Sequence, residues 1–143
     1  MLIKQISVFV ENRPGSLAEV TQMLADNGID IHAFCVADTT NFGILRMMVS
    51  DPDKTFAVLR EAQFTVSMTK IVAVRLQDRA GGLHDVLVAL REDGLSVEYA
   101  YSFISRSSGF AAVLLCLDDN EKGARLLKDR GFPVLNAEEM LEI

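Results

Sequence analysis

The sequence predicts an α+β fold of two tandem modules, each an antiparallel sheet with both helices on one face. Two observations carry this prediction. A unit of about 70 residues occurs twice in the 143-residue chain. Within each copy, strand-like runs and helical periods follow one another in the order β-α-β-β-α-β.

The repeat becomes visible when the sequence is shifted by 66 positions, which places Arg79 on Arg13 and Gly81 on Gly15. Other glycines and apolar residues then coincide as well: Val8 with Val74, Leu17 with Leu83, Val20 with Val86, Leu24 with Leu90, Gly28 with Gly94, Ile31 with Val97, and Gly43 with Gly109. Near the end of the copy the register slips by two, so that Phe64 falls on Phe132. We therefore predict one module at residues 1–69 and a second at 70–143.

The first half of the first copy reads as a strand followed by a helix. Residues 3–10 are rich in β-formers and end at an Asn-Arg-Pro-Gly turn. From Leu17 onward apolar residues recur at close to helical spacing. Ser16 is the expected helix cap, and Gly28 stands at the expected terminator position.

The second half of the copy adds a hairpin, a helix and a last strand. Residues 31–37 and 44–49 are predicted strands, with a turn at 39–43 between them. The Asp-Pro-Asp run at 51–53 opens a helix, because proline is favoured in the first helical turn. Residues 64–68 then close the unit as a short strand.

The second copy repeats this order. Its predicted strands cover 71–76, 96–104, 111–117 and 134–135, and its predicted helices cover 83–92 and 120–130. Thr69-Lys70 is a poor hairpin dipeptide, which favours one continuous strand from 64 to 76. The tail at 137–143 is expected to form a short helix. The β-α-β-β-α-β order corresponds to the ferredoxin-like arrangement.

Composition excludes several classes of function. The net charge is −6 and the fourteen basic residues are scattered, which disfavours nucleic acid and anionic membranes as partners. Only two cysteines occur, Cys35 and Cys116, too few for a disulfide framework or a metal cage, so we expect a reducing cytoplasm. No signal peptide or membrane-spanning run is recognisable.

The two strand-to-helix loops are the strongest candidates for a site. Residues 11–17 and 77–83 each place a short polar side chain, an arginine and a glycine just ahead of a helix. Helix N-termini offer unpaired N–H groups that suit a carboxylate, and glycine allows a ligand to approach the backbone. A tight turn with a solvated arginine explains the same residues equally well.

Residues 12–17, Asn-Arg-Pro-Gly-Ser-Leu, resemble the loop of ACT domains, in which Asp/Asn-Arg-Pro-Gly-x-Leu leads into the first helix. Residues 26–31, Asp-Asn-Gly-Ile-Asp-Ile, resemble the helix-end pattern of that family. The second copy matches with Asp-Arg-Ala-Gly-Gly-Leu at 78–83 and Asp-Gly-Leu-Ser-Val at 93–97. Ala80 departs from the usual proline, which puts the second site in doubt.

The resemblance implies a regulatory protein without catalysis or cofactor, which binds an amino acid between paired modules and controls a separate enzyme or transporter. The residues carried over by position are Asn12, Arg13, Pro14, Gly15, Ser16, Leu17, Asp30, Ile31, His32, Asp78, Arg79, Gly81, Gly82, Leu83, Ser96 and Val97. An apolar or aromatic amino acid is favoured as the ligand. Strands that are apolar on both sides also predict that the open sheet face or an edge is covered, by pairing of the modules and by a homodimer.

Three other functions are compatible with parts of the sequence. The two histidines, His32 and His84, do not recur between the copies, which disfavours a catalytic role. An RNA-binding module of the same fold would expose aromatic residues, and Tyr99, Tyr101 and Phe103 alternate along a predicted strand. A protein-interaction module with empty sites is the third alternative.

Overall fold

The computed structural model describes residues 1–38, 40–104 and 109–142. The chain divides into two compact units. We call Lys4–Thr69 the N-terminal module, and Met1–Ile3 together with Lys70–Ile143 the C-terminal module. Residues 1–3, which the sequence analysis assigns to the first copy, thus belong to the second unit. Leu2 packs against the core of the C-terminal module.

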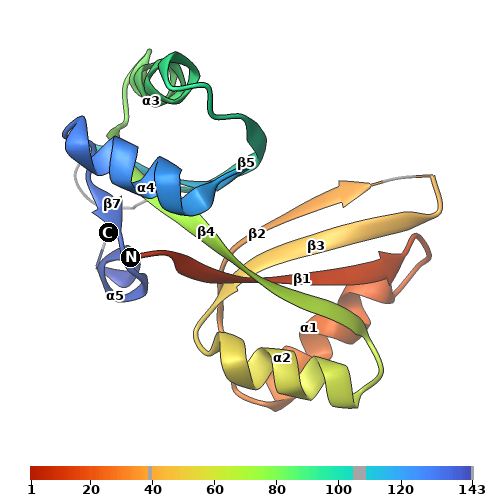
Figure 1. The fold of residues 1–143 in the computed structure, drawn as a ribbon. Coiled ribbons are helices and arrows are strands. Elements are labelled where there is room, and N and C mark those ends of the chain that lie inside the picture. Colours follow the sequence, from red (N-terminus) through yellow and green to blue (C-terminus); the bar gives the residue numbers. More distant parts are fainter. Residues whose placement is uncertain (39, 105–108, 143) are drawn as a thin grey trace. The chain divides into compact units, whose positions relative to one another are not determined.

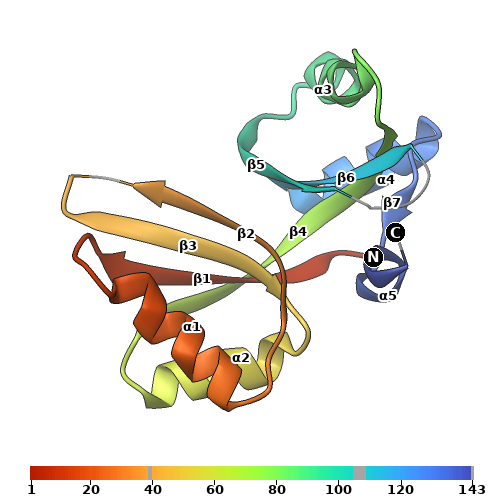
Figure 2. The same ribbon diagram turned by 180° about the vertical axis from the view of Figure 1, so that it is seen from behind.

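The N-terminal module has the predicted order of elements. These are β1 (Ile3–Glu11), α1 (Ser16–Asp26), β2 (Ile31–Asp38), β3 (Phe42–Val49), α2 (Pro52–Glu61) and the first part of β4 (Thr65–Gln77). Its strands lie in the order β2-β3-β1-β4, with β3 antiparallel to both β1 and β2. Both helices cover the same face of this sheet (Figure 1 and, from behind, Figure 2).

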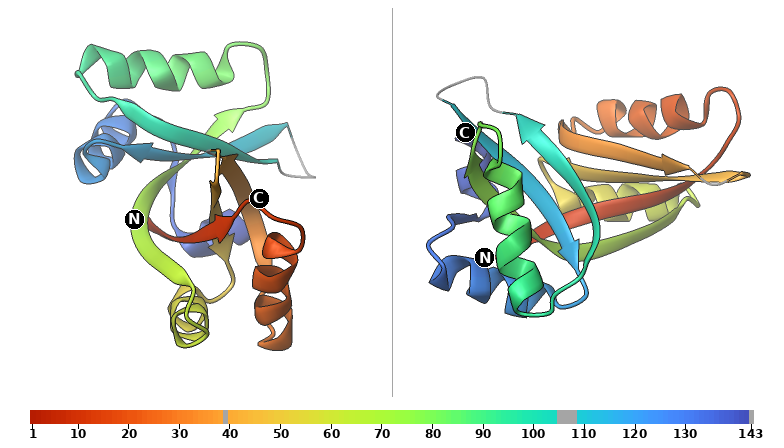
Figure 3. Two further views of the ribbon diagram at one scale, coloured as in Figure 1. Left: turned by 90° about the vertical axis from the view of Figure 1, so that its right-hand side faces the viewer. Right: turned by 90° about the horizontal axis from the view of Figure 1, so that it is seen from above.

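The C-terminal module repeats the arrangement. It consists of the second part of β4, then α3 (Gly82–Glu92), β5 (Val97–Ile104), β6 (Phe110–Leu117), α4 (Asn120–Asp129), β7 (Val134–Leu135) and the short α5 (Ala137–Leu141). Its strands lie in the order β7-β4-β6-β5, which corresponds to the order in the first module. Figure 3 shows this part of the chain in blue and green from two further directions.

The two copies share β4, a single strand of 13 residues. The boundary between the two units falls inside it, between Thr69 and Lys70. The prediction of one continuous strand is therefore confirmed.

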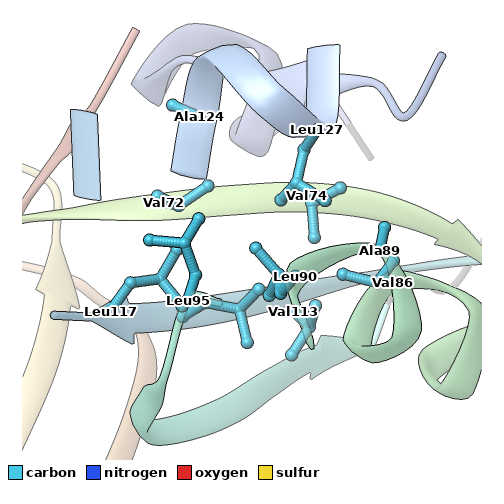
Figure 4. Close-up of a cluster of buried hydrophobic side chains, with 11 residues drawn as sticks. Val72, Val74, Val86, Ala89, Leu90, Leu95, Val113, Leu117, Ala124 and Leu127 are labelled. Carbon is cyan, nitrogen blue, oxygen red and sulfur yellow. The ribbon is translucent and has the colours of Figure 1, made fainter. Parts of the chain in front are cut away.

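Each module has its own hydrophobic core between its sheet and its helices. In the N-terminal module the core includes Val8, Leu24 and Leu59, from β1, α1 and α2. In the C-terminal module α3 and α4 pack on β4 and β6 through the side chains drawn in Figure 4, among them Leu90 and Leu127. The alternation of apolar residues along the strands places one side of each strand in these cores.

The residues at which the helices begin agree with the sequence-based prediction for α2 but not for α1. Asp51 caps α2 by accepting a hydrogen bond from the Lys54 N–H at 3.0 Å, with Pro52 as the first helical residue. The predicted cap at Ser16 is wrong, because Gly15 takes the N-cap position and Ser16 is already helical. Thr39, in the predicted turn at 39–43, lies outside the described residues. No helix within the described ranges is long and apolar enough to cross a membrane.

Candidate functional site

The loop between β1 and α1 is a tight backbone turn. The Arg13 N–H donates to the Glu11 carbonyl at 2.9 Å, and the Ser16 N–H donates to the Arg13 carbonyl at 3.3 Å. Gly15 then enters the helix with φ of 86°, in the left-handed region that favours glycine, and offers no side-chain cap. The helix therefore begins with amide groups that have no acceptor within the helix.

The arginine of this loop ties the strand to the helix. Arg13 Nε donates to Glu11 Oε2 at 3.1 Å, and Nη2 donates to Glu19 in the first turn of α1 at 3.1 Å. The hydrogen bonds with Glu19 and then Glu11 raise the pKa of the Arg13 guanidinium above its ordinary value. Arg13 is thus engaged within the loop, and its charge is opposed by two carboxylates.

In the second loop the equivalent arginine makes corresponding hydrogen bonds to the strand end and to the first turn of the helix. Arg79 donates to Gln77 Oε1 at 3.0 Å from Nε and to Asp85 Oδ2 at 2.6 Å from Nη2. Gly81, the counterpart of Gly15, has φ of 87°. Both loops therefore have the same design, in which arginine fixes the turn and glycine starts the helix.

Ser16 is the one residue of the first loop with a buried polar group. Its relative exposure is 6%, and its Oγ has no hydrogen-bond partner among the described residues. A buried hydroxyl without a partner costs free energy, so its presence calls for an explanation. Asn12, Pro14 and Leu17 are exposed by contrast.

A cleft of about 250 Å³ opens beside this serine in the N-terminal module. It lies where the end of β1, the start of α1, the start of β3 and the junction of α2 and β4 come together. Its lining residues are Phe9, Val10, Glu11, Arg13, Ser16, Glu19, Phe42, Gln63, Phe64 and Thr65. We call it the N-terminal cleft.

A second cleft, of about 340 Å³, occupies the same place in the C-terminal module. Its lining residues are Arg75, Leu76, Gln77, Arg79, Gly82, Asp85, Phe110, Gly131, Phe132 and Pro133. Each of them is the repeat equivalent of a residue in the first cleft, at a shift of 66 for the first six and 68 for the last four. The predicted match of Gly43 with Gly109 is therefore wrong, because the register slips before β3 and Gly43 corresponds to Ala111. We call it the C-terminal cleft.

The structure brings only part of the predicted site residues to these clefts. Arg13, Ser16, Arg79 and Gly82 line them. Gly15 lines a shallower groove of about 600 Å³ between α1 and α2. Asp78, Gly81 and Leu83 are exposed beside the second cleft but do not line it.

The predicted residues at the start of the second strand lie elsewhere in the module. Asp30, Ile31 and His32 follow the C-terminal end of α1, whereas the loop precedes its N-terminal end. A helix of 11 residues separates the two ends by roughly 16 Å. Ser96 and Val97 follow α3 in the same way. Within one module, the two sets of predicted residues are therefore not brought together.

Side chains with potential for catalysis are poorly placed for it. His32 Nδ1 lies 3.9 Å from Asp30 Oδ2, and its Nε2 is buried with no partner in the described part of the chain. Burial raises the pKa of the Cys35 thiol, against the opposing effect of Arg46, which disfavours the nucleophilic thiolate. No group of three potential metal ligands occurs among the described residues.

The aromatic row considered for RNA binding is not an exposed platform. Tyr101 is 8% exposed, and Tyr99 and Phe103 are half-buried. Stacking of unpaired bases requires accessible rings. This burial counts against the RNA-binding alternative.

The predicted site residues include only two of the ten residues that line each cleft, so the sequence missed most of the wall. Phe42, Gln63 and Thr65 are far from the loop in sequence and meet it only through the sheet. One available signal was the repeat itself, because the shifted register aligns Phe64 with Phe132, and both line their clefts.

Comparison with known proteins also identifies a pair of modules. A family model described as an ACT domain pair matches residues 1–141. Protein BT0572 from Bacteroides thetaiotaomicron has a similar crystal structure, with a TM-score of 0.92, 36% sequence identity, and coverage of 100% of this chain and 98% of that chain. A comparison with curated proteins found no match.

More distant structures share the fold at low identity. The regulatory subunit of aspartate kinase from Thermus thermophilus, in its ligand-free form, has a TM-score of 0.63 at 17% identity and covers 91% of this chain and 94% of its own. The corresponding subunit from Thermus flavus has a TM-score of 0.61 at 16% identity, with coverage of 88% and 90%.

Proposed function

The chain belongs to the family of ACT domain pairs, and on this premise we propose that it is a regulatory protein that binds an amino acid and has no catalytic activity of its own. The observation that carries the proposal is the buried Ser16 hydroxyl without a partner, at the wall of the N-terminal cleft. A ligand that supplies the missing hydrogen bond explains why this group is retained in the folded protein.

The N-terminal cleft contains partners for each part of an amino acid. The first-turn amides of α1 and the Ser16 hydroxyl can donate to a carboxylate. Glu11 and Glu19 can accept from an ammonium group, because each carboxylate has more acceptor positions than Arg13 occupies. Three phenylalanines, Phe9, Phe42 and Phe64, offer contact to an apolar or aromatic side chain.

We propose further that binding controls a separate enzyme or transporter and that the protein acts as a homodimer. The support for self-association is an exposed apolar pair, Phe34 and Val36, on the edge strand β2 of the N-terminal module. Exposed apolar edges favour pairing with another chain.

The test is a thermal-shift screen of the twenty amino acids at millimolar concentration. A ligand that binds only the folded state stabilises it by about 2.7 kcal/mol at a hundredfold excess over Kd. We expect a higher melting temperature with one or a few apolar or aromatic amino acids. The Ser16→Ala variant should lose most of this shift, whereas Glu61→Gln, an exposed residue of the same module that lines neither cleft, should keep it.

Gly15→Val would be a less informative variant than Ser16→Ala. A φ of 86° strains a β-branched residue, so a lost thermal shift could come from a distorted loop. Absence of a shift with all twenty amino acids, or an equal shift in Ser16→Ala, would exclude amino-acid binding in the N-terminal cleft.

A further inference from the structure

The two clefts occupy equivalent positions but carry opposite charge. The N-terminal cleft is lined by two carboxylates, Glu11 and Glu19, and one guanidinium, Arg13, a net charge of −1. The C-terminal cleft is lined by one carboxylate, Asp85, and two guanidinium groups, a net charge of +1. The two copies therefore share the position of the cleft and its equivalent lining residues, but the sign of the charge is reversed.

Two exchanges between the copies account for this reversal. Arg75 stands where the first copy has Phe9, and Gln77 stands where it has Glu11. The first exchange adds a positive charge and the second removes a negative one. The remaining charged pair, arginine with an acidic residue in the first helical turn, is the same in both loops.

Arg75 is the cation of the C-terminal cleft that no acidic side chain engages within residues 1–38, 40–104 and 109–142. Its guanidinium carbon lies 4.8 Å from the centre of the Phe110 ring, a cation–π contact. Its Nε is buried and has no hydrogen-bond partner among the described residues, and no ion pair of Arg75 is found there. Arg79, by contrast, donates to Gln77, the Ala80 carbonyl and Asp85.

The backbone of this cleft is also closely packed at the start of α3. A Cβ at Gly82 would lie 2.3 Å from the Gln77 carbonyl oxygen, so glycine keeps the first helical residue against the strand end. The first-turn amides of α3 then begin at the cleft wall, at the positive end of the helix dipole. Guanidinium, amides and a stacking ring together suit a planar or tetrahedral anion.

We propose that the C-terminal cleft is a binding site for an anionic group, a carboxylate or a phosphate, held by Arg75. This goes beyond the proposed function, which concerns an apolar or aromatic amino acid in the N-terminal cleft. The N-terminal cleft, with its net negative charge, suits a zwitterion whose ammonium group offsets Glu11 and Glu19. It disfavours a ligand of net negative charge, because like charges repel. One chain then binds an apolar or aromatic amino acid in the N-terminal cleft and an anion in the equivalent C-terminal cleft.

The test is titration calorimetry of the full chain at low salt with two probes, L-glutamate and inorganic phosphate. We expect one anion site per chain, with an affinity that falls as ionic strength rises. Preference for glutamate identifies a carboxylate ligand, and preference for phosphate identifies a phosphorylated one. Arg75→Phe, which installs the residue of the other copy, should weaken binding at least tenfold, and Arg75→Gln should do the same.

Arg91→Ala is the matched control, because Arg91 is an exposed cation in the last turn of the same helix, away from the cleft. It should bind the anion as the unmodified protein does. The reciprocal variant, Phe9→Arg with Glu11→Gln, gives the N-terminal cleft the charge of its counterpart and should raise the stoichiometry from one to two.

The melting temperature of each variant without ligand shows whether it has folded. Millimolar glutamate and phosphate that both fail to bind would overturn the proposal. Undiminished binding in both folded Arg75 variants would overturn it as well. A stoichiometry that stays at one in the folded reciprocal variant would refute the argument from charge.

Discussion

Gln63 shows at the scale of one residue that the N-terminal cleft is built with some strain. It is the one residue other than glycine with positive φ, 68°, in the described part of the chain. Its counterpart Gly131 takes φ of 84° without a Cβ penalty. A side chain in this region costs of order 1–3 kcal/mol. It follows α2 at a helix end where the Phe64 N–H donates to the Leu59 carbonyl at 3.0 Å, so the left-handed conformation of Gln63 leads the chain out of the helix onto the cleft wall.

The Ser16 hydroxyl predicts an opposition between stability and binding. Ser16→Ala removes a buried polar group without a partner, so we expect the free energy of unfolding of the ligand-free protein to rise by about 1 kcal/mol. Denaturant unfolding followed by circular dichroism measures this change. Ser50→Ala is the matched control and should destabilise, because the Ser50 hydroxyl accepts a hydrogen bond from the Asp30 N–H at 3.0 Å. A less stable Ser16→Ala protein would show that the hydroxyl already has a partner.

At the scale of the element, the sequence predicts the helices and strands well because each is encoded locally. The spacing of Val20 and Leu24 defines α1, and Pro52 after Asp51 defines the start of α2. The start of α1 was missed by one position, because glycine in the left-handed conformation replaced the side-chain cap that Ser16 was expected to provide. Such a cap leaves no signal beyond the glycine itself.

The cleft could be predicted only in part, because four elements build it. The loop arginine and Ser16 were found from the motif, whereas Phe42 and Gln63 reach the cleft through the pairing of β3 with β1 and the end of α2. Nor does sequence spacing show that Arg13 is engaged by Glu11 and Glu19, whereas Arg75 Nε has no hydrogen-bond partner in the part of the chain that the structure describes.

Close packing at the start of α3 gives a prediction for that element. Gly82→Ala would place a Cβ 2.3 Å from a backbone oxygen that cannot rotate away, so we expect a loss of roughly 1–3 kcal/mol in the free energy of unfolding. Chemical denaturation measures it, with the exposed His84→Ala on the same helix as the control. Equal stability of the two variants would mean that the second loop can shift to accommodate a Cβ, which the first copy already has at the equivalent Ser16.

At the scale of the whole molecule, the chain passes between the two modules at two places. β4 belongs to both modules, and residues 1–3 belong to the C-terminal module although they begin the first copy in sequence. Leu2 packs with the core cluster of that module. The sequence repeat predicts a boundary near residue 69 but gives no sign of this exchange, because three residues are too few to show a period.

The edge strand β2 offers a surface for self-association of the protein. Phe34 and Val36 are 64% and 42% exposed, and their counterparts on β5 are Ala100 and Ser102. The two apolar side chains lie on one side of β2, since their partners Met47 and Leu45 on β3 are core residues. An edge strand with such a pair offers both unpaired backbone groups and apolar surface to a second chain. We therefore expect the protein to sediment as a homodimer that uses this edge.

The second copy supplies the variant that tests this edge. Phe34→Ala with Val36→Ser reproduces the side chains of β5 and should weaken the dimer at least tenfold, equivalent to about 1.4 kcal/mol. Analytical ultracentrifugation over a range of concentrations measures the dissociation constant. Leu141→Ser is the control, because Leu141 is 57% exposed but lies on the short helix α5 of the other module and should leave the dimer intact. A monomer at all concentrations would refute self-association, and an unweakened dimer in the double variant would assign it to another surface.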